Sequence, residues 1–417
     1  MGKASLVLVK RQRADGREQG YWIGEGDVRE TDRVVKEKKL PTAKQAAKAR
    51  IEKLKDGSST PPDATPPPPG NGVDAPAAID FKSAAASAAA SKAQTEKWQW
   101  KGTLHPALSE ALVDMAGKLH AGMAQNPGKE TLLGLGVKYV MVGDLNPGVA
   151  GAYRPNMGGK DGKGGMVVMT KAIAQTIQDA LVKGEVTTHA QFNAFEVFAH
   201  EASHATSRMH QYEGINAPQS STQGRPHSTM EEGTTEIVGQ HYAASVIKGF
   251  GLKMDLKDSG AFGLKASTGA PMFEHDAATD MPRANTPVAY HPFCRNIAAM
   301  AMVAEDAKTP EEVGNATVNW ANTLKRTRGG LRYERLADRM LEPHLPRDKN
   351  DDLYNGAVEY AVNAGGALPV KNPPPFTAAR QELADHLKFL MGTNKSIKVG
   401  MLRAHVKTVA AKYKGAK

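Results

Sequence analysis

The proline-rich segment at residues 58–78, SSTPPDATPPPPGNGVDAPAA, is predicted to be a spacer between two folded parts of the chain. It has almost no large apolar side chains, so it cannot bury a core, and its closely spaced prolines favour an extended spacer. An alanine run, SAAASAAASKAQ, follows and extends the predicted linker to residue 95, with a helix as the alternative to an extended chain for this run. We therefore expect a small unit over residues 1–57, a Pro/Ala-rich linker over 58–95, and a larger folded region after it.

Residues 1–57 have the pattern of a small basic α+β unit. The segments SLVLVKRQ and GYWIGEG are typical of short strands, and TAKQAAKARIEKLKDG is typical of a helix that begins at Thr42 and ends at Gly57. Residues 1–56 carry 15 Lys and Arg against 9 Asp and Glu. The excess of positive charge suits an acidic partner or a polyanion, although no nucleic-acid-binding motif accompanies it.

The pattern of a globular domain begins near residue 96 and continues to about residue 340. A helical segment, HPALSEALVDMAGKLHAGM, is followed by three candidate strands, VKYVMVGD, AGAYRP and GGMVVMT, and then by the helix KAIAQTIQDALVK, which ends at Gly184. This order of elements predicts an α+β fold rather than alternating βαβ units. From about residue 290 the periodicity is helical to the end, so residues 341–417 are predicted as a mainly helical C-terminal region.

Charge and composition also bear on partners and location elsewhere in the chain. Residues 371–417 carry 10 Lys and Arg against 2 Asp and Glu, which makes this end a second candidate surface for a polyanion. No apolar run reaches the length of about 18 residues needed to cross a bilayer. The first residues, MGKASLVLVKRQR, lack the apolar core of a signal peptide. We expect cytoplasmic synthesis without a signal peptide, and export by a signal-independent route or carriage in a virion stays open.

The segment AHEASHATSRMH, residues 199–210, contains the main candidate for chemistry. Thr188 and Gln191 form a capping-box pattern, and apolar residues then recur at steps of three and four, which predicts a helix with one buried face. His200 and His204 are one turn apart, so their imidazoles can hold one Zn²⁺. Glu201 lies between them and is predicted to take the proton of a water activated by that zinc.

The single cysteine supports this choice of ligands, because Cys294 alone can form neither an internal disulfide nor a multi-thiolate zinc site. A nucleophilic role for Cys294 is disfavoured, since a buried structural cysteine is the ordinary case. Any metal must therefore be held by histidine and carboxylate.

The His-Glu-x-x-His helix and the strands before it resemble the zincin superfamily of metallopeptidases, over roughly Thr103–Met340. The resemblance implies a zincin-like α+β domain with a small mixed sheet and an active-site helix. It also implies hydrolysis of a peptide bond in a peptide or protein substrate. In that family an edge strand lies alongside the bound peptide, and AGAYRP or GGMVVMT is the candidate for it here.

Two residues compete for the third metal ligand. His210 has the spacing seen in metzincins, but Ser207 occupies the position where that pattern has a helix-breaking glycine. The rival segment, TMEEGTTEIVGQHYAASVIK, resembles the second metal-bearing helix of gluzincins. That resemblance makes Glu232 the third ligand and Glu236 a hydrogen-bond acceptor for a ligating histidine. The plain alternative is an acidic first turn containing Glu231 and Glu232, opened by Ser228 or Thr229.

Residues further along the chain complete the predicted site. In some gluzincins a tyrosine at a comparable distance donates a hydrogen bond to the developing oxyanion, and Tyr290 or His291 matches that position. The plain alternative is a tyrosine packed at the start of a helix. Arg154 and Arg295 are candidates for binding a substrate carboxylate.

The sequence therefore predicts a zinc metallopeptidase with His200, His204 and Glu232 as ligands and Glu201 and Tyr290 as catalytic residues. A small N-terminal unit, a proline-rich tether and a peptidase together resemble bacterial effectors, toxins and some phage-carried proteases. The alternative from another class is a non-catalytic docking protein with a zincin-like fold and polyanion-binding ends.

Overall fold

The computed structural model describes the following residues: 5–12, 18–24, 33–39, 79–124, 136–155, 165–207, 225–256, 273–284, 290–327, 331–347, 374–393 and 395–415. Over these residues the fold is mixed α+β, with many helices and only small sheets, as the order of elements predicted. The chain divides into two compact units. The first comprises Met1–Pro69, Leu345–Ala379 and Tyr413–Lys417, and the second comprises Gly70–His344 and Arg380–Lys412.

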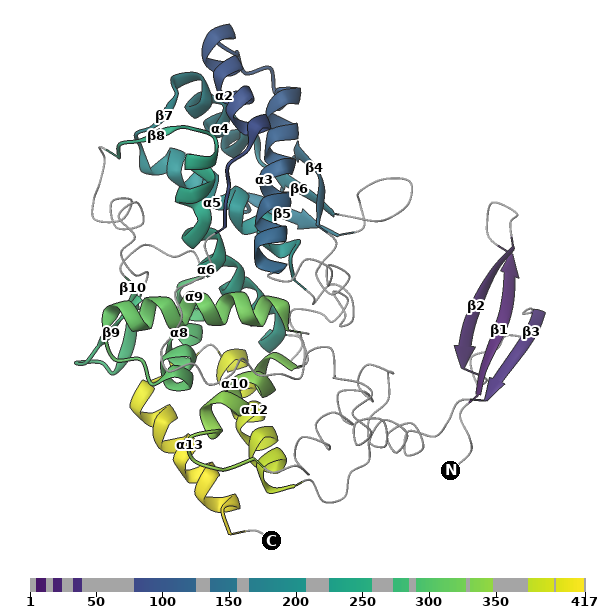
Figure 1. Cartoon of the computed structure of the whole chain (residues 1–417). Helices are drawn as coiled ribbons and strands as arrows, with labels where there is room; N and C mark the ends of the chain where they lie inside the picture. The colour runs from purple at the N-terminus through teal and green to yellow at the C-terminus, as the bar shows by residue number, and fades with distance from the viewer. Residues whose placement is uncertain are drawn as a thin grey trace. The chain divides into compact units, whose positions relative to one another are not determined.

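The first unit contains a three-stranded antiparallel sheet (Figure 1). Its strands are β1, Ser5–Gln12, β2, Glu18–Gly24, and β3, Arg33–Lys39, in the order β2-β1-β3. The sequence predicted β1 and β2, whereas β3 was not predicted, because five of its seven residues are charged and dilute the apolar alternation. The helix predicted from Thr42 to Gly57 lies outside the described residues.

The second unit begins with a packed helix that the sequence assigned to the linker. Helix α2 spans Ala84–Glu96, and the Ser83 side chain caps it by accepting a hydrogen bond from the backbone N–H of Ala86. The helix buries Ala86, Ala89, Ala90 and Ala93 and contacts α3, Pro106–Ala124, and α4, Lys171–Lys183. The structure thus differs from the prediction of a linker to residue 95, because these small side chains let helices approach closely.

A small mixed sheet follows α3 in the chain. Its strands are β4, Val137–Val142, β5, Gly151–Arg154, and β6, Gly165–Met169. The order is β4-β6-β5, with β4 parallel and β5 antiparallel to β6. All three strands were predicted, but the segment GGMVVMT is the central strand and cannot be the edge strand proposed for it. Among the described strands, β5 lies at an edge of this sheet and remains the candidate for pairing with a peptide.

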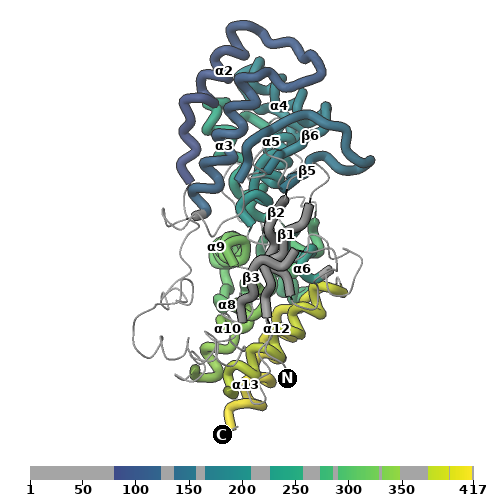
Figure 2. Tube along the Cα trace, turned by 90° about the vertical axis from the view of Figure 1, so that its right-hand side faces the viewer, coloured from purple at the N-terminus to yellow at the C-terminus, as the bar shows by residue number. Residues whose placement is uncertain are grey.

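Helices cover the sheet and position the candidate site. Helix α3 contacts β4, and helix α5, His189–His204, contacts β5 and β6 (Figures 1 and 2). Helix α4 ends at Gly184, which adopts a φ of 78°, a left-handed conformation that favours glycine. Two short parallel strands, β7, Glu185–Val186, and β8, Lys253–Met254, pair beside it. The core here includes the fully buried side chains Leu108, Leu112, Met115, Leu119, Phe195 and Phe198.

The remaining elements of the second unit are a hairpin and further helices. They are α6, Arg225–Gly249, β9, Phe273–Asp276, β10, Met281–Ala284, α8, His291–Glu305, α9, Pro310–Arg326, and α10, Arg332–Leu341. Helix α6 contacts α5 on one side and α8 and α9 on others (Figure 1). The chain closes with α12, Pro375–Thr393, and α13, Val399–Tyr413.

Part of the predicted C-terminal region belongs to the second unit. The Asn296 side chain on α8 donates to the carbonyl of Lys395 at 2.9 Å and accepts from the backbone N–H of Ile397 at 3.0 Å. These bonds differ from the prediction of a separate region at 341–417, because they attach residues 395–397 to α8. Among the described helices, none is both long and apolar enough to cross a membrane.

Candidate metal centre

Helix α5, which carries the two histidines, begins with a capping box. The Thr188 side chain accepts from the backbone N–H of Gln191, and the Gln191 side chain accepts from that of Thr188, so the predicted capping box is present. His200 and His204, one turn apart, lie with ring centroids 5.1 Å apart. Both residues are buried, with relative exposures of 7% and 8%. Their neighbouring apolar face fixes the helix against the core.

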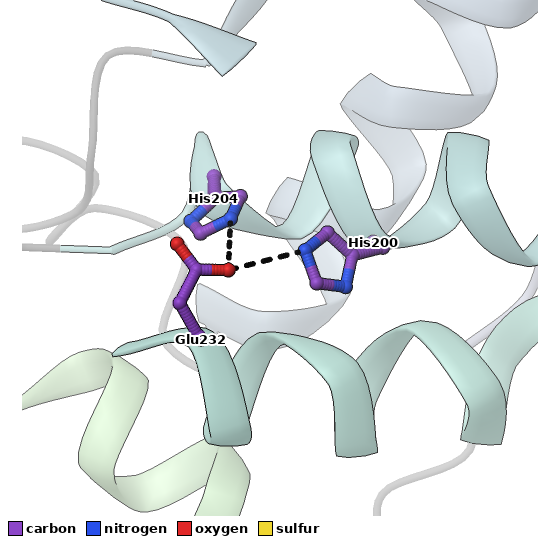
Figure 3. Close-up of side chains that lie close together, drawn as sticks. All are labelled: His200, His204 and Glu232. Atoms are coloured by element: carbon purple, nitrogen blue, oxygen red, sulfur yellow. Dashed lines mark ion pairs between the residues drawn. The ribbon is translucent and has the colours of Figure 1, made fainter. Parts of the chain in front are cut away.

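Helix α6 brings Glu232 opposite the two imidazoles (Figure 3). One carboxylate oxygen, Oε2, lies 3.6 Å from Nε2 of His200 and 3.6 Å from Nε2 of His204. Bonds of about 2.0–2.2 Å in a tetrahedral site would separate neighbouring ligand atoms by about 3.3–3.5 Å. The three ligand atoms lie within 4.8 Å of one another. This buried His-His-Glu group can therefore hold a metal ion.

Two more carboxylates of α6 orient the imidazoles. Nδ1 of His200 donates to Oε2 of Glu236 at 2.8 Å, and Nδ1 of His204 donates to Oε1 of Glu231 at 3.0 Å. Because carboxylates only accept, these bonds place a proton on each Nδ1 and direct each Nε2 towards Glu232. The hydrogen bond predicted between Glu236 and a histidine of the motif is present, and Glu231 makes the same contact with the second histidine.

The site attracts positive charge. Burial lowers the pKa of His200, but hydrogen bonds to Glu232 and Glu236 outweigh it and raise the pKa to about 10. Burial raises the pKa of Glu232, whereas the two histidines hold that pKa below its ordinary value. Without a metal the carboxylates therefore favour two imidazolium rings. A divalent cation supplies the same charge as the two protons that it displaces from the Nε2 atoms, so the donor set fits such an ion.

Glu201 is a residue of α5, and its side chain packs against Gly151 on the edge strand β5. The residue is 7% exposed. A Cβ atom added at Gly151 would lie 2.6 Å from Cγ of Glu201 and 3.0 Å from its Oε1. Glycine is thus required at this point of β5, because any side chain would displace the Glu201 carboxylate. The predicted general base is packed directly against the strand that is the candidate for binding substrate.

Tyr290 also lies at the centre. It is the residue before α8, and its ring stacks on that of His200, with centroids 5.7 Å apart and planes at 21°. The residue is 37% exposed, so its ring borders solvent on one side. Burial raises the pKa of Tyr290, and the charges of Glu232 and Glu201 raise it further. The phenol therefore keeps its proton and can donate a hydrogen bond.

The other predicted residues have varied positions. His210 lies outside the described residues, so the metzincin-like alternative is not tested by the structure. Arg154 is exposed at the end of β5, and Arg295 donates to Ser396. Cys294 is fully buried, and burial raises the pKa of its thiol, as expected for a structural cysteine.

The acidic first turn considered for Glu231 and Glu232 is absent from the structure. Helix α6 begins at Arg225, so both residues lie beyond its first turn. The sequence did not predict the partners of Glu231, which are Lys325 and Arg332. Both of these cations are fully buried, with 0% of their side chains exposed. The basic residues in the last turn of α9 are the only sequence feature that pointed to such a partner, and they are equally typical of a helix C-terminus.

Gly239 permits the close approach of α6 to α5, the helix that carries both histidines. A Cβ atom there would lie 2.9 Å from both Cα and N of His200. We expect Gly239→Ala to destabilise the protein by about 1–3 kcal/mol, because the backbone that carries His200 must move. The measurement is urea unfolding followed by circular dichroism.

The matched control for this substitution is Gly117→Ala on α3, where an added Cβ would meet no atom within 4 Å. We expect this change to stabilise the helix by about 0.5–1 kcal/mol, because alanine loses less backbone entropy than glycine. Equal unfolding midpoints for Gly239→Ala and the wild type would contradict the close approach of α5 and α6.

Comparison with models of known families, with curated proteins and with solved structures found no match to this chain. The likeness to zincins therefore depends on the motif and on the geometry of the residues around it.

Proposed function

We propose that this chain is a zinc-dependent metallopeptidase of the gluzincin type. One observation carries the proposal: both Nε2 atoms converge on a single oxygen of Glu232, while a second carboxylate fixes each imidazole from behind. Histidine nitrogen and carboxylate oxygen are ligands that zinc accepts, and three protein ligands leave a fourth position open, as in catalytic zinc sites. The buried Glu201 beside them makes catalysis a better explanation than a structural zinc site, which is usually closed by four ligands.

The residues of the centre have distinct proposed roles. His200, His204 and Glu232 would hold the zinc, which lowers the pKa of a bound water to about 7. Glu201 would accept a proton at its carboxylate and return it to the leaving amine. Tyr290 would donate its hydroxyl proton in a hydrogen bond to the oxygen on which negative charge develops. The raised pKa of Tyr290 supports this role, because a phenolate could not donate.

An extended peptide is the proposed substrate. Strand β5 lies at an edge of its sheet, antiparallel to β6, and Gly151 on it packs against Glu201. A peptide that paired with this edge would be held by backbone hydrogen bonds, which accept many sequences. This placement would bring a peptide bond close to the general base.

The first test of the proposal is metal content. We expect the wild-type chain to bind about one Zn²⁺, with thermal unfolding shifted upwards by added Zn²⁺ and returned by a chelator. We expect Glu232→Ala to weaken zinc binding by more than the about 10–100-fold that loss of an outer hydrogen-bond partner costs, because a direct ligand is removed. Titration with Zn²⁺ against a fluorescent chelator measures both affinities.

Two variants make this test decisive. His210→Ala is expected to keep wild-type affinity, and Glu311→Ala, which removes an exposed carboxylate on α9, controls for charge alone. If His210→Ala releases zinc and Glu232→Ala does not, the metzincin-like alternative is correct. If the wild-type chain binds no zinc, the proposal fails.

The basic ends do not enter this mechanism. On the described part of the C-terminal end, Lys395, Lys398 and Lys407 are exposed. A polyanion or acidic partner at this surface stays a prediction from charge, and its binding would weaken steeply with added salt.

A further inference from the structure

The carboxylate of Glu231, which orients His204, accepts hydrogen bonds at both of its oxygens. Oε1 of Glu231 accepts from Nδ1 of His204 at 3.0 Å and from Nζ of Lys325 at 2.9 Å. Oε2 accepts from Oγ of Ser207 at 2.8 Å and from a terminal nitrogen of Arg332 at 2.8 Å. Because each oxygen accepts at least two hydrogen bonds, the carboxylate plane cannot rotate without breaking charge-assisted hydrogen bonds.

The two cations come from helices outside the motif. Lys325 lies in the last turn of α9 and also donates to the carbonyl of Ser203 at 3.1 Å and to the hydroxyl of Thr235. Arg332 is the first residue of α10 and donates to Oγ of Ser207 at 2.6 Å. Neither side chain has any solvent contact, and burying a charge is unfavourable unless it is paired and hydrogen-bonded.

The carboxylate that orients His200 has different hydrogen-bond partners. Glu236, the partner of His200, accepts a longer hydrogen bond, 3.5 Å, from the side chain of Gln240 on the same helix. Glu231, by contrast, contacts the side-chain cations of Lys325 and Arg332. The two buried cations therefore contact the carboxylate that bonds His204, the last residue of α5.

We propose that Lys325 and Arg332 are positioning residues of the metal centre, acting through Glu231 to hold Nε2 of His204 in line with Glu232. This inference rests on the proposed function, since it assumes that the His-His-Glu group binds a metal. Loss of either cation would free the Glu231 carboxylate to turn, and the His204 ring would sample orientations in which Nε2 does not meet the ion. Helices α9 and α10 are then part of the metal site, although they supply no ligand.

The test compares Arg332→Met with Arg339→Met on the same helix. Arg339 forms ion pairs with Glu305 on α8 and with Glu342, and neither carboxylate belongs to the metal centre, so its loss removes a cation of α10 away from Glu231. We expect Arg332→Met to bind Zn²⁺ about 10–100-fold more weakly and to change the visible absorption of the Co²⁺-loaded protein. Arg339→Met is expected to keep both the wild-type affinity and the wild-type spectrum, even where it lowers the melting temperature.

A conservative variant keeps the test decisive if Arg332→Met does not fold. Arg332→Lys retains the charge, but a single ammonium cannot bridge Ser207 and Glu231 as the guanidinium fork does. We expect it to weaken Zn²⁺ binding by roughly threefold to tenfold, towards the lower limit for loss of an outer partner. If a folded Arg332→Met or Arg332→Lys variant keeps the wild-type Zn²⁺ affinity and the wild-type Co²⁺ spectrum, the inference about Lys325 and Arg332 is wrong. The proposed function is not affected by that result. A wild-type chain that binds neither Zn²⁺ nor Co²⁺ would overturn the proposed function as well.

Discussion

Replacing Glu201 with glutamine is expected to lower peptide hydrolysis by about 10²–10⁴-fold and to leave zinc binding unchanged. Glutamine has nearly the same shape as glutamate, so its side chain fits against Gly151 of β5 as that of Glu201 does. It cannot accept the proton at neutral pH, and the acid–base step is lost. The measurement is the initial rate of cleavage of a mixture of unstructured fluorogenic peptides, with zinc content determined on the same samples.

The control for this substitution is Glu110→Gln, which alters an exposed carboxylate on α3. It should retain the wild-type rate. The result also separates the two classes of function considered from the sequence. A docking protein with a degenerate zincin-like fold would bind its partner equally well with either residue at position 201. Hydrolysis by Glu201→Gln at the wild-type rate would remove this residue from the mechanism.

Local patterns predicted the parts of the site that lie within one helix. The capping pair Thr188 and Gln191 fixed the start of α5, and the spacing of His200 and His204 placed both rings on one side of it. Glu232 came from the resemblance of its segment to a known metal-bearing helix. The structure brings these three residues together, because α5 and α6 pack closely at Gly239.

Contacts between distant residues could not be predicted in the same way. Lys325 and Arg332 lie 94 and 101 positions after Glu231, and no periodicity joins residues so far apart. At the sequence level Lys325 is a basic residue at a helix end, where solvent exposure is the ordinary outcome. The alanine run of α2 presents the opposite case. Its composition is typical of a linker, yet Ala86, Ala89, Ala90 and Ala93 recur at helical spacing and are buried.

The largest expected loss of stability comes from Glu231→Gln. The substitution leaves Lys325 and Arg332 buried without their counter-ion, and removal of one partner of a buried ion pair costs about 3–5 kcal/mol. Urea unfolding of the metal-free protein in a chelator measures the change, so that any loss of zinc does not contribute. The control is Glu305→Gln, whose partner Arg339 is partly exposed, and for which we expect about 1 kcal/mol or less.

The same experiment has a defined pH dependence. Burial raises the pKa of Glu231, but Lys325, Arg332 and His204 outweigh it and hold the pKa well below the ordinary 4.5. Because the pKa is lower in the folded than in the unfolded chain, the carboxylate contributes its full stability above about pH 4.5, and this contribution is lost as the pH falls towards the folded value. The difference in unfolding free energy between wild type and Glu231→Gln should therefore shrink as the pH falls below about 4.5. A difference that grew on acidification would mean that Glu231 is protonated in the native protein, and the buried cations would then require another counter-ion.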